Sequence, residues 1–350
     1  MSSKTILYFG LNPASLSSNC TLTVDENSNS IIYHVLIVCD YIHYSRGGRK
    51  LEKEKIGLYL GLAGVICFSL TLPATTIAVE HFGTTIVGLG RTVIAALLVA
   101  VILIGRREKI PSVQQFKSIL IVAAGAVLGF PLLTSWAMKT LPVSHGAVEV
   151  ALLPLATAGI AMYRAGERLS IRFWISSLVG SGAVILYAGS LGFGSLQVED
   201  AGILAAVIIL GLSYAEGGKL SKEIGSWQVI AWAILIGAPI FVIPVALSIS
   251  AEMLHAPVQA WSSLIYLAVV SQFLAYVAWY AGMALGGIAR ISQLQYLQPF
   301  LMIIFSALFL EESITTMTFV TAVIVVVSVY VGKNAPISNT HTSAKMIEKG

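Results

Sequence analysis

The chain has 350 residues, of which 57% are hydrophobic and only 11% are charged, and its mean hydropathy is +0.85. Because soluble domains carry about 25% charged residues, this composition excludes a soluble globular protein. The formal net charge of +4 is too small for an electrostatic grip on nucleic acid. The three cysteines, Cys20, Cys39 and Cys67, have no spacing typical of a disulfide framework or a zinc site.

The first fifty residues differ in character from the rest. Their apolar stretch at residues 31–44 contains His34, Asp40 and His43 and is too short to span a bilayer. Residues 6–11 are a poor signal peptide, because Lys4 is the only charge before them and Gly10 interrupts them. We expect residues 1–50 to be an appendage: a disordered or interfacial leader, or an upstream extension that a different start codon would remove.

Ten apolar stretches joined by short connections follow. Runs of this length must be helices, because lipid offers no backbone partners and a β-barrel would show alternating ten-residue strands. We therefore expect an all-α polytopic membrane protein with ten transmembrane helices. The stretches cover residues 56–79, 84–104, 117–138, 142–162, 171–190, 201–218, 227–248, 262–284, 288–310 and 314–332.

Basic residues are concentrated on one of the two predicted sides of the membrane. All but three of the 21 lysines and arginines fall on one side, the exceptions being Lys4, Arg91 and Lys139. The positive-inside rule makes that side the cytoplasm. This distribution predicts an even number of spans with both termini cytoplasmic, and residues 333–350 are expected to form a disordered cytoplasmic tail.

The chain contains an internal repeat. The text LLPLATAGIAMYRAGERLS, which starts at Leu152, is echoed by LQPFLMIIFSALFLEESIT, which starts at Leu297. Five spans separate the copies, so the second enters the membrane from the opposite side, which is the inverted plan of many secondary transporters. The alternative is chance alignment in low-complexity apolar text, but the shared proline-to-glutamate spacing favours a repeat. The pairs 145 residues apart are Pro154 and Pro299, Glu167 and Glu312, and Met138 and Met283.

The P-x12-E phrase, each time followed by one more span, resembles EamA-type members of the drug/metabolite transporter superfamily. Arg91 with Ala95 and Ala96 in the second span adds to this resemblance, which covers residues 56–332. It implies a secondary carrier of the bacterial inner (plasma) membrane that exports small metabolites, often amino acids, by alternating access. It also implies two repeats of five helices around a central cavity, at residues 51–190 and 200–332.

Two ionisable residues lie inside predicted spans, where charge is costly. Arg91 and Glu149 are each about seven residues from the outer end of a span, roughly 10 Å deep at about 1.5 Å per residue. We expect Arg91 to grip an anionic group of the substrate and Glu149 to bind a proton or a substrate amine; the alternative is a structural ion pair. His145 lies on the face of Glu149 and is a candidate proton relay, the alternative being an interfacial residue.

The ninth span is polar in its inner half. Ser292, Gln295 and Gln298 share one helical face just before Pro299, which weakens the helix by freeing a carbonyl. Glutamines are untenable in lipid, so we expect them to line a wet cavity; the alternative is hydrogen bonding between helices.

Aromatic and small residues complete the pattern. Trp232 lies deep in the seventh span, and Gln272 with Tyr276 forms a stripe in the eighth that could stack on an apolar part of the substrate. Small residues at spacing four are expected to let helices pack closely. They are Gly57 and Gly61, Gly125 and Gly129, and Ala278, Gly282 and Gly286.

Enzyme motifs are missing from the sequence. It contains no phosphate loop, no H-E-x-x-H, no G-x-S-x-G and no acidic cluster for magnesium. We therefore expect no enzyme, no cofactor and no metal; an uncoupled facilitator or channel and, less strongly, an intramembrane enzyme are the alternatives. The expected partners are a small-molecule substrate, the lipid bilayer and, if transport is coupled, protons, with the protein a monomer or homodimer.

Overall fold

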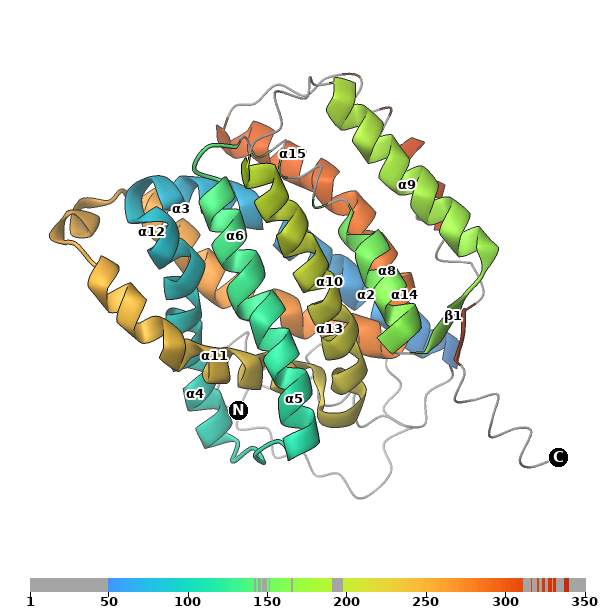
Figure 1. Cartoon of the computed structure of the whole chain (residues 1–350), viewed down its shortest axis with the longest axis horizontal. Helices are drawn as coiled ribbons and strands as arrows, with labels where there is room; N and C mark the ends of the chain where they lie inside the picture. Colours follow the sequence, from blue (N-terminus) through green and yellow to red (C-terminus); the bar gives the residue numbers. More distant parts are fainter. Residues whose placement is uncertain are drawn as a thin grey trace, which may run out of the picture.

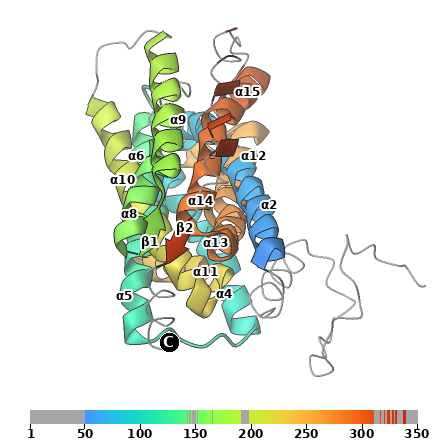
Figure 2. The same cartoon turned by 90° about the vertical axis from the view of Figure 1, so that its right-hand side faces the viewer.

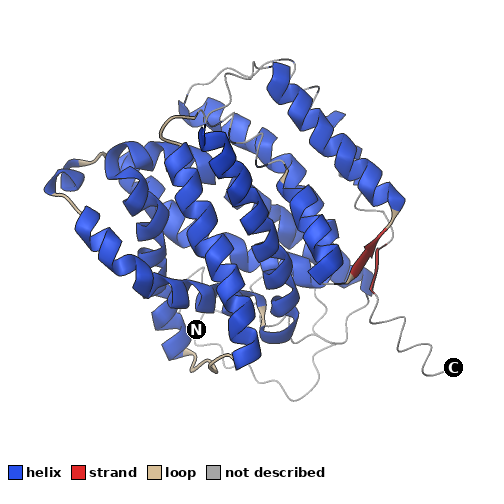
Figure 3. Ribbon diagram, in the orientation of Figure 1, coloured by secondary structure: helices blue, strands red, loops and turns tan. Residues whose placement is uncertain are grey.

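The computed structural model describes residues 50–141, 152–164, 166–190, 198–310 and 337–339, with isolated positions between 143 and 150 and between 316 and 331. Within these residues the chain is helical apart from one short pair of strands, which confirms the all-α fold class (Figure 3). The α-helices are α2 (Lys50–Ser69), α3 (Thr71–Thr85), α4 (Arg91–Gly105), α5 (Val113–Val122), α6 (Phe130–Ala137), α8 (Leu153–Arg164), α9 (Ile171–Ser190), α10 (Val198–Ile224), α11 (Ser226–Ser248), α12 (Val258–Ile265), α13 (Ala275–Gly286), α14 (Ile288–Ser292) and α15 (Gln298–Leu310). Three segments are π-helical, η2 (Ile86–Gly90), η3 (Ala123–Gly129) and η5 (Tyr266–Leu274), and two are 3-10 helices, η4 (Ala251–His255) and η6 (Gln293–Leu297).

Six helical stretches within the described residues are long and apolar enough to cross a membrane. The first, Glu52–Gly105, has 54 residues, enough for two crossings of a hydrocarbon core about 30 Å thick. Gly83 interrupts it with φ 73° and ψ 168°, a conformation that a residue without a Cβ adopts readily. The break falls between the two predicted stretches 56–79 and 84–104. The other five are Val113–Ala137, Val198–Ile224, Ser226–Ser248, Val258–Gly286 and Ile288–Phe309.

Glycines bring helices α2 and α13 into backbone contact. A Cβ added to Gly57 would lie 2.7 Å from the nitrogen of Gly286, and one added to Gly282 would lie 2.8 Å from the nitrogen of Gly61. Gly125 lies equally close to α10, 2.6 Å from the carbonyl oxygen of Ile209 by the same construction. The close packing predicted from the spacing of four is confirmed, because none of these positions has room for a side chain.

The segments predicted to share one side of the membrane come together at one end of the molecule, which we call the basic end (Figure 2). There the start of α2 meets the start of α14, the end of α4 and the start of α5 reach the start of α11 and the end of α10, and α8 leads into strand β1 (Glu167–Leu169). Arg106, for example, lies 5.1 Å above the ring centroid of Trp227. The charge pattern therefore groups the correct chain segments at one end of the molecule.

The two copies of the repeated text have matching starts and opposite directions. Helices α8 and α15 begin 145 residues apart, at Leu153 and Gln298, each with proline as its second residue. The carboxyl end of α8 adjoins the amino end of α14, and from there the chain runs back through α15 (Figure 1).

A short strand pair lies beside this junction. Strand β1 pairs antiparallel with β2 (Ile337–Asn339), with Glu167 opposite Asn339. Three residues of the tail that was expected to be disordered are thus described as a strand.

Candidate functional site

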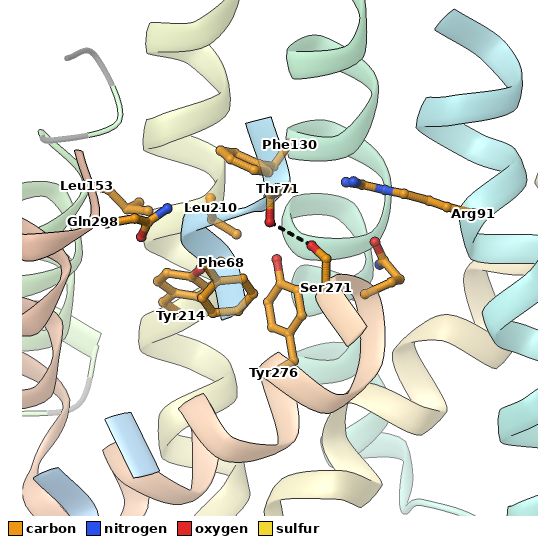
Figure 4. A pocket seen from close by; sticks show the side chains of 11 residues that line it. Phe68, Thr71, Arg91, Phe130, Leu153, Leu210, Tyr214, Ser271, Tyr276 and Gln298 are labelled. Carbon is orange, nitrogen blue, oxygen red and sulfur yellow. Dashed lines mark hydrogen bonds between the residues drawn. The ribbon is translucent and has the colours of Figure 1, made fainter. Parts of the chain in front are cut away.

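A small central cavity lies between helices from both halves of the chain (Figure 4). Several lining residues lie where the regular α-helix is interrupted. Thr71 follows the break between α2 and α3 at Leu70, Arg91 follows η2, and two further lining residues belong to η5. Such interruptions are frequent at functional sites. The free space admits at most about one water molecule, so this conformation leaves no room for a solute. It is lined by Phe68, Thr71, Arg91, Phe130, Leu153, Leu210, Tyr214, Ser271, Gln272, Tyr276 and Gln298.

Arg91 is the charged side chain of this cavity. It is 2% exposed, and Figure 4 shows its guanidinium group reaching in from α4 toward the other lining residues. Its Nε and Nη1 atoms have no hydrogen-bond partner among the described residues. A buried guanidinium is costly unless its donors are paired, so these two atoms are suited to receive an anion.

Neutral polar groups line the cavity from both halves of the chain. The hydroxyls of Thr71 and Ser271 share a hydrogen bond of 2.8 Å. The Gln272 amide donates to the carbonyl oxygen of Ala126 over 3.3 Å, and the Tyr276 hydroxyl donates to the same oxygen over 3.5 Å. Ala126 belongs to π-helical η3, where the regular i to i+4 bonding is lost and a carbonyl can accept from another helix.

Aromatic rings pack along one wall. The ring centroids of Phe68 and Tyr276 are 4.9 Å apart, and those of Tyr214 and Trp279 are 5.4 Å apart. Tyr280 joins the same cluster, 5.7 Å from Tyr276. The cavity therefore combines one cation, several neutral hydrogen-bonding groups and a flat apolar surface, which suits an amphipathic solute.

Four of the residues predicted from the sequence meet in this cavity: Arg91, Gln272, Tyr276 and Gln298. Glu149, His145 and Glu312 lie outside the described residues. Trp232 is half-buried against the hydrophobic core and is not a lining residue.

The glutamines of the ninth span have different surroundings. Gln295 is 1% exposed, but it does not line the cavity. Gln298 lines the cavity, and its Oε1 lacks a described partner. Gln293 donates to the hydroxyls of Ser176 and Ser177, 3.2 Å each, so hydrogen bonding between helices explains that residue.

Glu167 and the prolines occupy the junction and the helix starts rather than the cavity. Both carboxylate oxygens of Glu167 accept backbone hydrogen bonds, from Ile288 over 2.9 Å and from Ala289 over 2.8 Å. Pro154 and Pro299 are the second residues of α8 and α15, where a missing N–H does not break the helix.

The sequence reasoning missed Thr71, Ser271, Tyr214 and, away from the cavity, Glu216. The hydroxyl pair has no sequence signal, because its members are 200 residues apart. Glu216 could have been identified, because it is an ionisable residue inside the predicted stretch 201–218, and that criterion identified Arg91. Among the residues that the structure describes, no three histidine, cysteine or acidic side chains gather as a metal site would require.

Comparison with known proteins places this arrangement among transporters. The pattern of the EamA-like transporter family matches the chain twice, over residues 55–189 and 198–331, and two matches to one family indicate a duplicated repeat. The transporter YdeK of Bacillus subtilis, described as uncharacterized, is 40% identical over 265 residues, which cover 75% of this chain and 92% of that protein.

A more distant relative has a described substrate class. A protein of Streptantibioticus cattleyicolor described as a probable terminal-alkyne amino-acid exporter is 21% identical over 263 residues, covering 75% of this chain and 87% of that protein. A solved crystal structure superposes with a TM-score of 0.64 at 16% identity, covering 79% of this chain and 98% of the other. The structural match shows that the fold is shared.

Proposed function

The chain belongs to the EamA-like transporter family, and from this premise we propose that it is a carrier that exports small amphipathic metabolites bearing a carboxylate, amino acids among them, by alternating access. The family is one of transporters, so the intramembrane enzyme is no longer an alternative. The single observation that carries the proposal is the buried guanidinium of Arg91, without a described partner, in a cavity walled by both halves of the chain.

The chemistry of the cavity supports a carboxylate beside an apolar group. Arginine is well suited to bind carboxylates, and Nε and Nη1 of Arg91, which have no partner among the described residues, are donors that a carboxylate can accept from. The rings of Phe68 and Tyr276 offer an apolar surface nearby. The distant relative described as an amino-acid exporter agrees with this class.

The proposal includes ten membrane-spanning helices in two inverted repeats, with the basic end and both termini in the cytoplasm of a bacterial cell. Support comes from the opposite directions of α8 and α15, and from the gathering of the basic segments at one end. Tags on each terminus that react only from outside the cell would contradict this orientation.

The first prediction concerns Arg91. Cells that overexpress the protein should survive toxic amino-acid analogues that stop control cells, and Arg91→Gln should abolish that resistance. Removing one partner of a buried charge pair costs about 2–5 kcal/mol, so the half-saturating concentration in counterflow should rise by about 30-fold or more. Arg91→Lys keeps the charge but not the forked geometry, so its half-saturating concentration should lie between those of the unaltered protein and Arg91→Gln.

Arg107→Gln is the matched control, because Arg107 is exposed at the end of α4 and should transport as the unaltered protein does. Equal counterflow by the Arg91→Gln and Arg107→Gln variants would refute a substrate contact at Arg91. Resistance to none of the analogues, beside intact folded protein, would refute the substrate class.

The second prediction concerns proton coupling, which we assign to Glu149 with His145 as its relay. Glu149→Gln should abolish transport driven by a pH gradient yet leave counterflow, because glutamine mimics the protonated carboxyl group. If Glu149 instead only pairs with Arg91, the variant should lose folded yield, since breaking a buried pair costs about 3–5 kcal/mol.

The double variant separates the two roles. With Arg91→Gln added, a structural pair predicts that folded yield returns, whereas proton coupling predicts folded protein that does not respond to a pH gradient. Unchanged yield and unchanged pH dependence in every variant would discard both roles.

A further inference from the structure

Glu216 is a buried carboxylate at the basic end whose contacts lie outside the transport cavity. Its side chain is 6% exposed. Nη2 and Nε of Arg164 donate to its Oε2 over 2.9 and 3.1 Å, and the Ser118 hydroxyl donates to its Oε1 over 2.5 Å. Three donors thus compensate one buried charge, as a carboxylate in a low dielectric requires.

These contacts join the two repeats. Ser118 in α5 and Arg164 in α8 belong to the first family match, and Glu216 in α10 belongs to the second. Two other carboxylates of the first half also reach into the second at this end: Glu54 is 2.9 Å from Nη1 of Arg290, and Glu167 accepts from the backbone start of α14. Around the cavity, by contrast, the described polar contacts between the halves involve neutral groups.

We propose that Glu216 and Arg164 form a gate: their ion pair holds the basic end closed, and it must separate for the cavity to open to that side of the membrane. This inference rests on the alternating access proposed above. Helix α10 connects the gate with the cavity, because Tyr214 lines the cavity and Glu216, two residues further along the helix, belongs to the gate.

The surroundings of Glu216 allow the ion pair to separate without leaving either charge buried and unpaired. The Arg164 side chain is 37% exposed and is readily hydrated when released. Lys219, three residues along α10, lines a polar pocket with Glu216 and, at that spacing, can neutralise it. Glu167 differs, because both its oxygens are held by backbone N–H groups, so we assign the gate to Glu216.

Packing fixes the position of α10 while the gate is closed. A Cβ added to Gly217 would lie 2.5 Å from the ring of Tyr280 in α13, so α10 packs directly against the aromatic cluster beside the cavity. A movement of α10 away from α8 would therefore shift the gate and the cavity wall together.

Accessibility labelling tests the gate without any substrate. In a background with Cys20, Cys39 and Cys67 replaced by serine, Ser271→Cys places one reporter in the cavity, and a membrane-impermeant maleimide is applied to inside-out and right-side-out vesicles. Glu216→Gln should raise the labelling rate from the side of the basic end by about tenfold, which is the population change given by 1.4 kcal/mol. The matched control is Glu223→Gln, since Glu223 lines the same polar pocket but is exposed; it should label like the unaltered background.

Two further variants make the test decisive. Arg164→Gln should behave like Glu216→Gln, and keeps the test available if the latter does not fold. Exchanging the charges, Glu216→Arg with Arg164→Glu, should return the labelling rate toward the background value. Rates from both sides that match the Glu223→Gln control in both single variants would overturn the gate, whereas a functioning gate beside failed export of amino-acid analogues would overturn only the proposed substrate.

Discussion

Glu167 is held by backbone groups rather than by a basic side chain. Gly287, with φ 90°, turns the chain so that the N–H groups of Ile288 and Ala289 both donate to this carboxylate, which is 2% exposed. The contact joins the end of α8 to the start of α14, so we regard this glutamate of the repeated motif as a structural joint between the halves.

The third prediction concerns this joint. Glu167→Ala should leave two buried donors without acceptors, at about 1–3 kcal/mol each, and lower the unfolding temperature of the purified protein. Glu167→Gln keeps one acceptor oxygen and should lose less. Glu223→Ala, at an exposed position of α10, is the control; unfolding of Glu167→Ala at the same temperature as this control would show that the joint does not stabilise the fold.

The cavity was partly predictable from single residues. Polar side chains inside apolar spans need a structural or functional explanation, and this criterion identified four lining residues: Arg91, Gln272, Tyr276 and Gln298. Thr71 was not identified, because a hydroxyl in a helix normally bonds its own preceding turn and gives no sign of a partner in a distant helix.

At the scale of elements, glycine decides how closely helices approach. In the contact of α2 with α13, the space that a Cβ of Gly282 would need is filled by backbone: the nitrogen of Gly61 at 2.8 Å and the carbonyl oxygen of Gly57 at 2.9 Å. Backbone atoms cannot move aside as a flexible side chain can, so the two helices would have to separate.

The fourth prediction follows from this contact. Gly282→Ala should reduce the yield of folded protein in the membrane, although alanine is the better helix former by about 1 kcal/mol. Gly159→Ala in α8 is the matched control, because no described atom lies within 4 Å of its added Cβ. Fluorescence-detected size exclusion would measure both yields, and equal yields would show that α2 and α13 tolerate separation.

Hydropathy located the helices better than it located their ends and interruptions. The predicted stretch 171–190 has the bounds of α9, Ile171–Ser190. Helix α10 continues to Ile224, past the predicted end at residue 218, because apolar runs mark contact with lipid and polar residues can extend a helix beyond it. The π-helical segment η5 could not be foreseen, since one extra residue in a helical turn has no signature in composition.

For the whole molecule, the order of the spans along the chain and their repetition could be predicted from the sequence. Which spans lie next to one another in space could not. The spacing of 145 residues correctly pairs the starts of α8 and α15 at Leu153 and Gln298. That both residues line one cavity depends on how the halves dock, which is decided by side-chain packing between residues far apart in the sequence. The docking of the halves is also what alternating access must change.

The fifth prediction tests that change directly. The hydroxyls of Thr71 and Ser271, one from each half, are 2.8 Å apart at the cavity, so the sulfur atoms of cysteines at both positions should come within reach of the bond of about 2.0 Å that a disulfide forms. In a background without other cysteines, oxidation of the Thr71→Cys, Ser271→Cys variant should tie the halves together and stop counterflow, and reduction should restore it.

The single-cysteine variants, oxidised in the same way, control for local damage to the cavity and should keep their counterflow. A disulfide at this point permits small side-chain adjustments but not the separation of the two halves, so it distinguishes rocking of the halves from gating by a few side chains. Undiminished counterflow by the fully cross-linked protein would mean that the halves do not part at the cavity. In that case alternating access would have to come from movements of a few side chains around fixed walls, rather than from rocking of the two halves.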